Sequence, residues 1–127
     1  MSDLNITGVD FVTVFVNDYP AAVEFYGTTL GLEHPVQYGQ MPGGEFEAGN
    51  VTLSVLDVKA IGREFQASTH PLALHVDDVE VARADLEAKG VEFAADTLDS
   101  GVCHMAFFTD PDGNALMLHH RYAPRDA

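Results

Sequence analysis

An internal repeat constrains the fold of this chain more than any other feature of its sequence. The stretch "FVNDYPAAVEFYGTTLGLE" is matched about sixty residues later by "HVDDVEVARADLEAKGVE", which aligns Val16 with Val76 and Asp18 with Asp78. The downstream segments correspond as well, since "GNVTLSVLD" is similar to "GNALMLHHR". A repeat of this kind indicates that one supersecondary unit is used twice.

The first copy begins with a strand and continues into a helix. Val9 to Val16 is dominated by β-branched and aromatic residues, which strands prefer. Both of its faces are apolar, so we expect the strand to be covered on both sides. Asp18 is a suitable N-cap, Pro20 is tolerated in the first helical turn, and Gly31 ends the helix. The apolar stripe of the helix is Val23, Tyr26 and Leu30.

The second copy repeats these signals in the same order. A short strand, Leu72 to Val76, is followed by Asp78 as the N-cap of a helix that ends at Gly90. The stripe of this helix is Val79, Ala82 and Leu86. "TDPDGN" forms a tight turn before the last strand. Each copy therefore reads as a strand, a helix and about three further strands. This order predicts one α+β domain over residues 1–127, with module one at about 9–58 and module two at about 71–122.

These strings together resemble the vicinal oxygen chelate superfamily, which contains glyoxalases, bleomycin resistance proteins and extradiol dioxygenases. The resemblance rests on "FYGTTLGL", on "HVDDVEVARADLEAKGV" and on "FFTDPDGNALML", and it extends from about Val9 to Tyr122. It implies two βαβββ modules whose sheets curve into an open, U-shaped barrel. Chains of this superfamily commonly pair so that the cups are completed, and we therefore expect a homodimer.

The resemblance also locates the positions where metal-dependent members bind a divalent ion. Four strand positions that usually carry His, Gln or Glu correspond here to Phe11, Ser54, Pro71 and Met117. Phe and Pro have no donor side chain, a serine hydroxyl is a weak ligand, and a thioether suits softer ions. We therefore predict a site with no metal and no cofactor. Without a metal to polarise the substrate, metal-dependent glyoxalase I or extradiol dioxygenase activity is not expected.

Strand alternation gives the inner face of the cup an apolar lining with a few polar groups. Such linings are typical of small-molecule pockets, and Phe rings offer stacking surfaces. We expect a small hydrophobic or aromatic ligand and a role like that of the drug-binding resistance proteins. The predicted ligand-binding residues are Phe11, Thr13, Phe15, Thr52, Ser54, Leu56, Pro71, Ala73, His75, Met117 and His119, with Ala115 on the same face. The alternative is that these residues fill a core without a cavity.

Histidines leave an enzymatic alternative open. His75 and His119 fall on the predicted inner face, and His104 is a candidate third metal ligand. Imidazoles also donate and accept protons near neutral pH. In this alternative the chain is a lyase, isomerase or oxygenase with a displaced site, and these three are its candidate catalytic residues. These histidines could instead be structural, with hydrogen bonds to backbone or water. A third alternative for the whole chain is a domain that binds no ligand and only dimerises. Cys103 and His104 are adjacent, so a strand points them to opposite faces and disfavours a nucleophilic pair.

Charge and cysteine content narrow the partners and the location. The chain has 20 acidic residues and 6 Lys or Arg, with a formal net charge of −14. This charge repels phosphate backbones and anionic lipids, so we expect no nucleic-acid partner and no membrane association. No apolar stretch approaches membrane-spanning length. Cys103 is the only cysteine, which excludes an intrachain disulfide and predicts a cytoplasmic protein.

The stretch "VQYGQMPGGEFEAGN", residues 36–50, is rich in Gly and polar residues. We expect it to form a flexible rim of the cup. Asp57 and the segment Glu45 to Glu47 would attract a cationic guest there.

Overall fold

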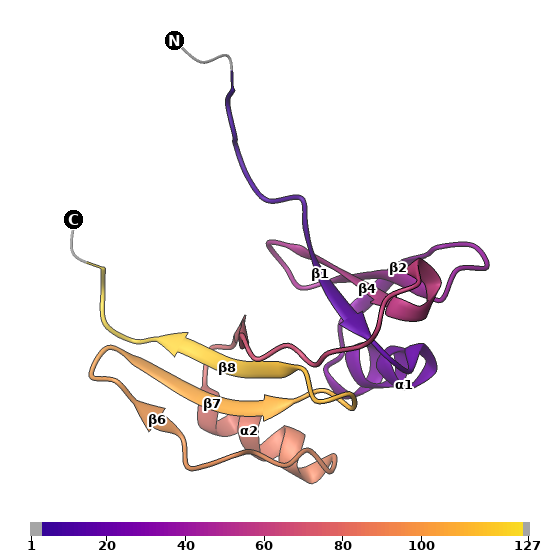
Figure 1. The fold of residues 1–127 in the computed structure, drawn as a ribbon. Coiled ribbons are helices and arrows are strands. Elements are labelled where there is room, and N and C mark those ends of the chain that lie inside the picture. Colours follow the sequence, from indigo (N-terminus) through magenta and orange to yellow (C-terminus); the bar gives the residue numbers. More distant parts are fainter. Residues whose placement is uncertain (1–3, 126–127) are drawn as a thin grey trace.

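Residues 4–125 are described by a computed structural model, in which the two halves of the chain form two similar modules (Figure 1). Module one contains β1 (Phe11–Val16), α1 (Tyr19–Val23) continued by a π-helical turn (Glu24–Thr29), β2 (Glu33–Gln37), β3 (Gly43–Glu47), β4 (Thr52–Asp57) and a 3₁₀ turn (Val58–Ile61). Module two contains β5 (Leu72–His75), α2 (Val79–Ala88), β6 (Leu98–Asp99), β7 (Cys103–Thr109) and β8 (Ala115–Arg121). The predicted α+β fold of two βαβββ modules is confirmed.

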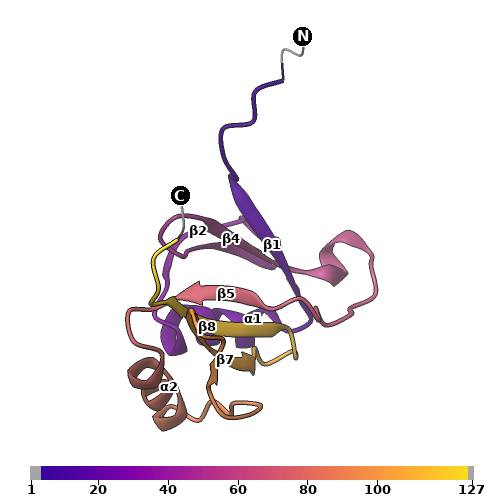
Figure 2. The ribbon, with the colours of Figure 1, turned by 90° about the vertical axis from the view of Figure 1, so that its left-hand side faces the viewer.

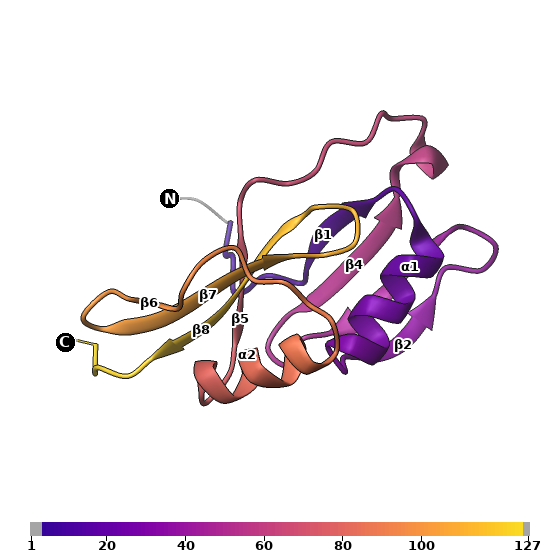
Figure 3. The same cartoon turned by 90° about the horizontal axis from the view of Figure 1, so that it is seen from below.

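Each module forms one four-stranded mixed sheet, and the two sheets share a topology. The strand orders are β1-β4-β3-β2 and β5-β8-β7-β6. The first strand of each module pairs in parallel with its last strand, and the other pairs are antiparallel. Viewed from below, α1 and α2 lie in front of the strands (Figure 3). We call the side of each sheet that packs on the helices its core face, and the other side its open face.

The helices begin and end at the predicted signals. Asp18 and Asp78 each accept a hydrogen bond at 3.1 Å from the backbone N–H three residues later. Gly31 and Gly90 follow the helices with φ of 73° and 94°, a conformation that residues with a Cβ rarely adopt. Among the helices within residues 4–125, none has the length and apolar character needed to cross a membrane.

One hydrophobic core connects the core faces of both sheets with the helices. The ring of Phe25, in the helical turn of module one, lies 5.3 Å from Tyr26 and 6.4 Å from Phe108 on β7. Full burial of such side chains stabilises by about 1.5–3 kcal/mol each. The largest completely buried side chains are Tyr26, Phe46, Leu53, Leu116, Val16, Val55 and Val79. Because these residues come from both modules, the modules fold around a shared interior.

The "TDPDGN" turn fastens the two modules through a buried carboxylate. Asp110 Oδ2 accepts hydrogen bonds from the Tyr26 hydroxyl at 2.7 Å and from Asn114 Nδ2 at 2.8 Å. Asn114 Nδ2 also donates to the carbonyl of Phe15 at 2.8 Å. The turn predicted from Pro and Gly therefore also links β7 and β8 to the first helix and strand.

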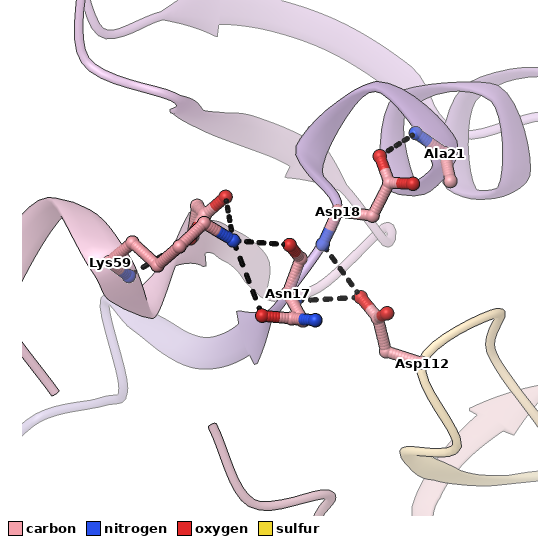
Figure 4. Close-up of polar contacts among 6 residues, drawn as sticks. Asn17, Asp18, Ala21, Lys59 and Asp112 are labelled. Atoms are coloured by element: carbon pink, nitrogen blue, oxygen red, sulfur yellow. Dashed lines mark hydrogen bonds and ion pairs between the residues drawn. The ribbon is translucent and has the colours of Figure 1, made fainter. Parts of the chain in front are cut away.

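A second carboxylate of the same turn holds the junction between β1 and α1 (Figure 4). Asp112 Oδ2 accepts the backbone N–H of Asn17 at 2.7 Å and that of Asp18 at 3.1 Å. On the other side, Lys59 Nζ donates to the carbonyl of Asn17 at 2.6 Å and pairs with Asp57 at 3.2 Å. The junction is thus held from module two and from the end of β4.

Some predictions about strands were wrong. The first strand begins at Phe11 rather than Val9, and the fifth ends at His75 rather than Val76. The first strand is not covered on both sides, because no segment within residues 4–125 buries its start. Phe11 is 55% and Val12 36% exposed. Figure 2 shows residues 4–10 extending away from the body before β1, and the segment after β4 looping outward before β5.

Residues 36–50 do not form one continuous loop, because Val36 and Gln37 belong to β2 and Gly43 to Glu47 form β3, and these two strands pair as a hairpin. Glycine is required there for close packing. A Cβ on Gly44 would lie 2.6 Å from both His34 Nε2 and the Tyr19 hydroxyl oxygen. His34 in turn stacks on Phe46 with ring centroids 4.3 Å apart. The glycines that predicted a loop therefore allow β3 to pack closely against neighbouring side chains.

Candidate functional site

Strand register places six of the predicted ligand-binding residues on the open face of module one. Phe11 is more than half exposed, whereas Ser54 is buried under its neighbours. Residues opposite one another on paired strands share a face, so these six form three rows across β1 and β4. The rows are Phe11 with Thr52, Thr13 with Ser54, and Phe15 with Leu56.

Two of these rows continue onto β3 and end in carboxylates. Glu47 lies opposite Thr52, and Glu45 lies opposite Ser54. Thr52 Oγ1 donates to Glu47 Oε1 at 2.7 Å. The Tyr38 hydroxyl donates to Glu45 Oε2 at 3.1 Å and lies 2.9 Å from Ser54 Oγ. The open face of module one therefore grades from aromatic rings on β1, through hydroxyls on β4, to acids on β3.

The phenol of Tyr38 is held in its neutral form. Burial raises its pKa, and the carboxylate of Glu45 acts in the same direction, while the hydrogen bond with Ser54 opposes them. A neutral phenol keeps its proton and can therefore donate a hydrogen bond to the carboxylate. The sequence prediction placed Glu45 and Glu47 on a loop. The alternation Glu-Phe-Glu around the buried Phe46 is the sequence pattern that could have placed both acids on one face of a strand. Asp57, in contrast, is buried and bound to Lys59.

The open face of module two carries four more of the predicted residues in two rows, and Pro71 directly precedes β5. Met117 lies opposite Ala73 on β5 and Phe107 on β7. His119 lies opposite His75 and Met105. This face is therefore apolar in its middle and carries imidazoles toward the end of β5.

The three candidate catalytic histidines do not come together. The side chain of His75 is 71% exposed and its Nε2 lies 3.2 Å from Asp77 Oδ1. Its ring lies 5.9 Å from that of His120. His104 pairs across strands with His120, on the opposite face from His119, and its Nε2 lies 3.4 Å from an oxygen of Asp99. Within residues 4–125, no group of three or more His, Cys, Asp or Glu side chains is arranged to hold a metal ion.

The four positions to which the resemblance assigns a metal do not fit a divalent ion here. Phe11 presents only its ring, and Ser54 is engaged with Tyr38. Pro71 precedes β5 directly, and Met117 lies among apolar neighbours. A set of one hydroxyl and one thioether lacks the imidazoles and carboxylates that such ions need.

A hollow of about 460 Å³ lies where β1 meets the starts of β5 and β8. This volume is within the range of small-molecule pockets. Of the predicted residues, Thr13, Phe15, Pro71 and Ala115 line it, together with Gln66, Ser68 and His70 of the connecting segment. Its walls also include Val12, Val14, Leu72, Asn114 and Leu116, and the other predicted residues lie outside its lining. The structure thus gathers part of the predicted set around one hollow and leaves the rest on the open faces.

Comparisons with known proteins agree with this architecture. The family model for the Glyoxalase/Bleomycin resistance protein/Dioxygenase superfamily matches residues 8–118. The chain is 28% identical over 120 residues to "Uncharacterized protein YraH" from Bacillus subtilis (strain 168), which covers 85% of this chain and 94% of that protein. The crystal structure of SMU.1112c is 28% identical, with a TM-score of 0.74 over 91% of this chain and 100% of that one.

A third similar structure is that of a member of the Glyoxalase/bleomycin resistance protein/dioxygenase superfamily from Sphaerobacter thermophilus DSM 20745. It is 24% identical, with a TM-score of 0.77 over 90% of this chain and 97% of that one. These likenesses confirm the predicted fold.

Proposed function

Because the chain belongs to the glyoxalase/bleomycin resistance protein/dioxygenase superfamily, we propose that it binds a small hydrophobic or aromatic molecule without a metal ion. The observation that carries this proposal is the donor chemistry at the four metal positions. Phe11 and Pro71 offer no donor atom, and Ser54 and Met117 offer weak or soft ones. The role that fits best is sequestration, like that of a drug-binding resistance protein, rather than catalysis.

The exposed aromatic surface of module one supports a ligand of this kind. The ring of Phe11 is 55% exposed on a sheet face, and Phe15 borders the hollow of about 460 Å³. Covering apolar surface stabilises a complex by roughly 25 cal/mol per Å². A flat apolar guest on these rings would therefore gain affinity without any metal bond.

We also propose that two copies of the chain form a homodimer that completes the cup. Each module has a free edge at its first strand, β1 or β5. The edge strand β1 carries none of the Lys or Pro residues that usually protect such edges. Large apolar side chains are exposed at Val12 on this strand and at Val9 just before it. Light scattering over a range of concentrations should give twice the mass of one chain, and a monomer at every concentration would refute the dimer.

The expected location follows from charge and from the cysteine. Cys103 is buried and free, as suits a reducing cytoplasm. The net charge of −14 disfavours nucleic acid and anionic membranes as partners.

An enzyme with a displaced site is the second candidate, because His75 and His119 lie opposite each other on β5 and β8. Turnover of a hemithioacetal or a catechol that disappears in both His75→Ala and His119→Ala would favour this candidate. If the wild type and both variants turn over these substrates no faster than the uncatalysed reaction, the enzymatic candidate is wrong.

A thermal-shift screen with a small-molecule library in the presence of EDTA tests the binding proposal. A guest at 100 times its Kd should stabilise the folded protein by about 2.7 kcal/mol. Phe11→Asp should abolish the shift. Val81→Asp is the matched control, because Val81 is an apolar residue that is 66% exposed on α2. The proposal fails if no compound shifts the wild type, or if Phe11→Asp keeps the full shift.

A further inference from the structure

The open face of module one combines the exposed aromatic ring of Phe11 with acids that form no ion pair among the described residues. Glu45 and Glu47 on β3 end the rows that start at Thr13 and Phe11 on β1. Glu33 on β2 lies opposite Glu47. Like charges directly opposite each other on paired strands are destabilising. A positive group placed beside them would relieve this repulsion.

Residues 4–125 supply no basic side chain paired with Glu45 or Glu47. None of the ion pairs within residues 4–125 includes Glu45 or Glu47. One oxygen of each accepts a hydroxyl hydrogen bond, from Tyr38 or Thr52. The second oxygen of each has no hydrogen bond to the described residues. The hydroxyls therefore hold the carboxylates in place and leave their charge uncompensated.

The aromatic side of the same face already receives one cation from within the chain. The guanidinium carbon of Arg63 lies 5.7 Å from the centre of the Phe15 ring, within the range of a cation–π contact. Phe11, four residues earlier on the same face, has no basic side chain over it among the described residues and is 55% exposed. Arg63 therefore makes a cation–π contact with Phe15, and a positively charged guest could make the same type of contact with Phe11.

Strand spacing sets the size of a guest that reaches both sides of the face. Neighbouring strands lie roughly 4.8 Å apart, so β1 and β3 are separated by roughly 9–10 Å. A ring on Phe11 with a charged nitrogen at the end of a short chain spans this distance to Glu47. The hydroxyls of Thr52 and Ser54 lie between them on β4.

The charge of the whole protein favours the same class of guest. A net charge of −14 raises the local concentration of cations and lowers that of anions. Three of the basic residues are paired with acids of their own neighbourhood, at Lys59, Arg83 and Lys89. An anionic aromatic guest would meet repulsion from Glu45 and Glu47.

We infer that the guest of this site is a cationic aromatic molecule, an amine or quaternary ammonium compound. Its ring packs on Phe11, and its positive group lies beside Glu45 and Glu47. This inference rests on the proposed ligand-binding function and names the chemical class of the ligand.

Calorimetry with three probes of similar size tests the inference. The probes are 3-phenylpropyltrimethylammonium, the neutral 4-phenylbutanol and the anionic 4-phenylbutyrate. The cation should bind at least about tenfold more tightly than the anion at low salt, and the difference should shrink as salt is added. Glu45→Gln with Glu47→Gln should remove most of this preference. Glu24→Gln, which removes an exposed carboxylate from the first helix, should leave it unchanged.

Each outcome separates the inference from the proposed function. Equal binding of all three probes, lost in Phe11→Asp, would refute the cationic guest and leave the aromatic binding site intact. A cation preference that survives in the double Gln variant would refute the role of the two carboxylates. If Mn²⁺ binds stoichiometrically and displaces the cationic probe, the two carboxylates bind a metal ion and the inference of an organic cation is wrong. No binding of any probe at millimolar concentration would count against both proposals. Circular dichroism of each variant shows that it is folded.

Discussion

Replacing Tyr26 with Phe tests how the two modules are held together. The hydroxyl of Tyr26, in the helical segment of module one, donates to Asp110 Oδ2 at 2.7 Å. Tyr26 has no exposed surface, and Asp110 is 3% exposed. The substitution removes one oxygen and leaves the ring in place, so it deletes the hydrogen bond with little change in packing.

The expected loss of stability follows from the bonds that remain. Hydrogen bonds to charged groups contribute about 1.5–3 kcal/mol each. Asp110 would keep its bonds from Asn114 Nδ2 and from the backbone N–H groups of Asp112 and Asn114. Because the carboxylate is not left without donors, we expect the lower half of that range, about 1.5–2 kcal/mol. For a domain of this length, this corresponds to a fall in Tm of roughly 5–8 °C.

The chain offers a matched control for this substitution. The hydroxyl of Tyr122 donates to Asp99 Oδ1 at 2.8 Å, but Tyr122 is 45% exposed. Tyr122→Phe therefore removes the same type of bond at the surface, where water replaces it at a cost below about 0.5 kcal/mol. Urea unfolding measures both free energies, with m-values expected to stay unchanged.

The explanation depends on burial, so the comparison can contradict it. If Tyr26→Phe costs no more than Tyr122→Phe, the buried hydroxyl does not fasten the modules. If the m-value changes strongly in Tyr26→Phe, the two modules unfold separately and the single-core description is wrong.

Three further predictions follow from the same structure. Burial, followed by the charge and hydrogen bond of Asp110, raises the pKa of Tyr26, so the folded chain keeps a proton that the unfolded chain loses above pH 10. Stability is intact below pH 10 and this residue lowers it by about 1.4 kcal/mol per pH unit above; Tyr26→Phe should show a shallower alkaline decline. Gly44→Ala should cost about 1–3 kcal/mol in urea unfolding, because its Cβ would lie 2.6 Å from two side chains, whereas Gly8→Ala, with nothing within 4 Å, should cost little. Asp112→Ala should speed amide hydrogen exchange at Asn17 and Asp18, whose N–H groups it would leave without their acceptor; unchanged exchange would mean that the loop does not hold this junction.

Local signals in the sequence predicted the modules well. Asp18 and Asp78 as caps, and Gly31 and Gly90 as stops, act over a few residues and can be read from one sequence. Alternation with a period of two also placed residues such as Thr13 and Ser54 on one face, and the register confirms that they are neighbours.

Contacts between distant residues could not be read in this way. The bond between Tyr26 and Asp110 joins residues 84 positions apart, and nothing in either segment indicates the other. The motif at Asp110 predicted a turn, which is its local role, but not its link to the first module.

The acids of β3 were misplaced because their strand begins with Gly43 and Gly44, residues that strands usually avoid. Those glycines predict a loop unless the nearby rings of Tyr19 and His34 are known. The position of His104 likewise required the register of β7 and β8, which turns it away from His119.

The metal content of purified, tag-free protein tests the central claim most directly. We predict far less than one equivalent of Zn, Ni, Fe or Mn per chain, because Phe11, Ser54, Pro71 and Met117 lack suitable donors for these metals. One equivalent of metal that is retained through dialysis and lost in His75→Ala would contradict this claim and would favour the displaced enzymatic site.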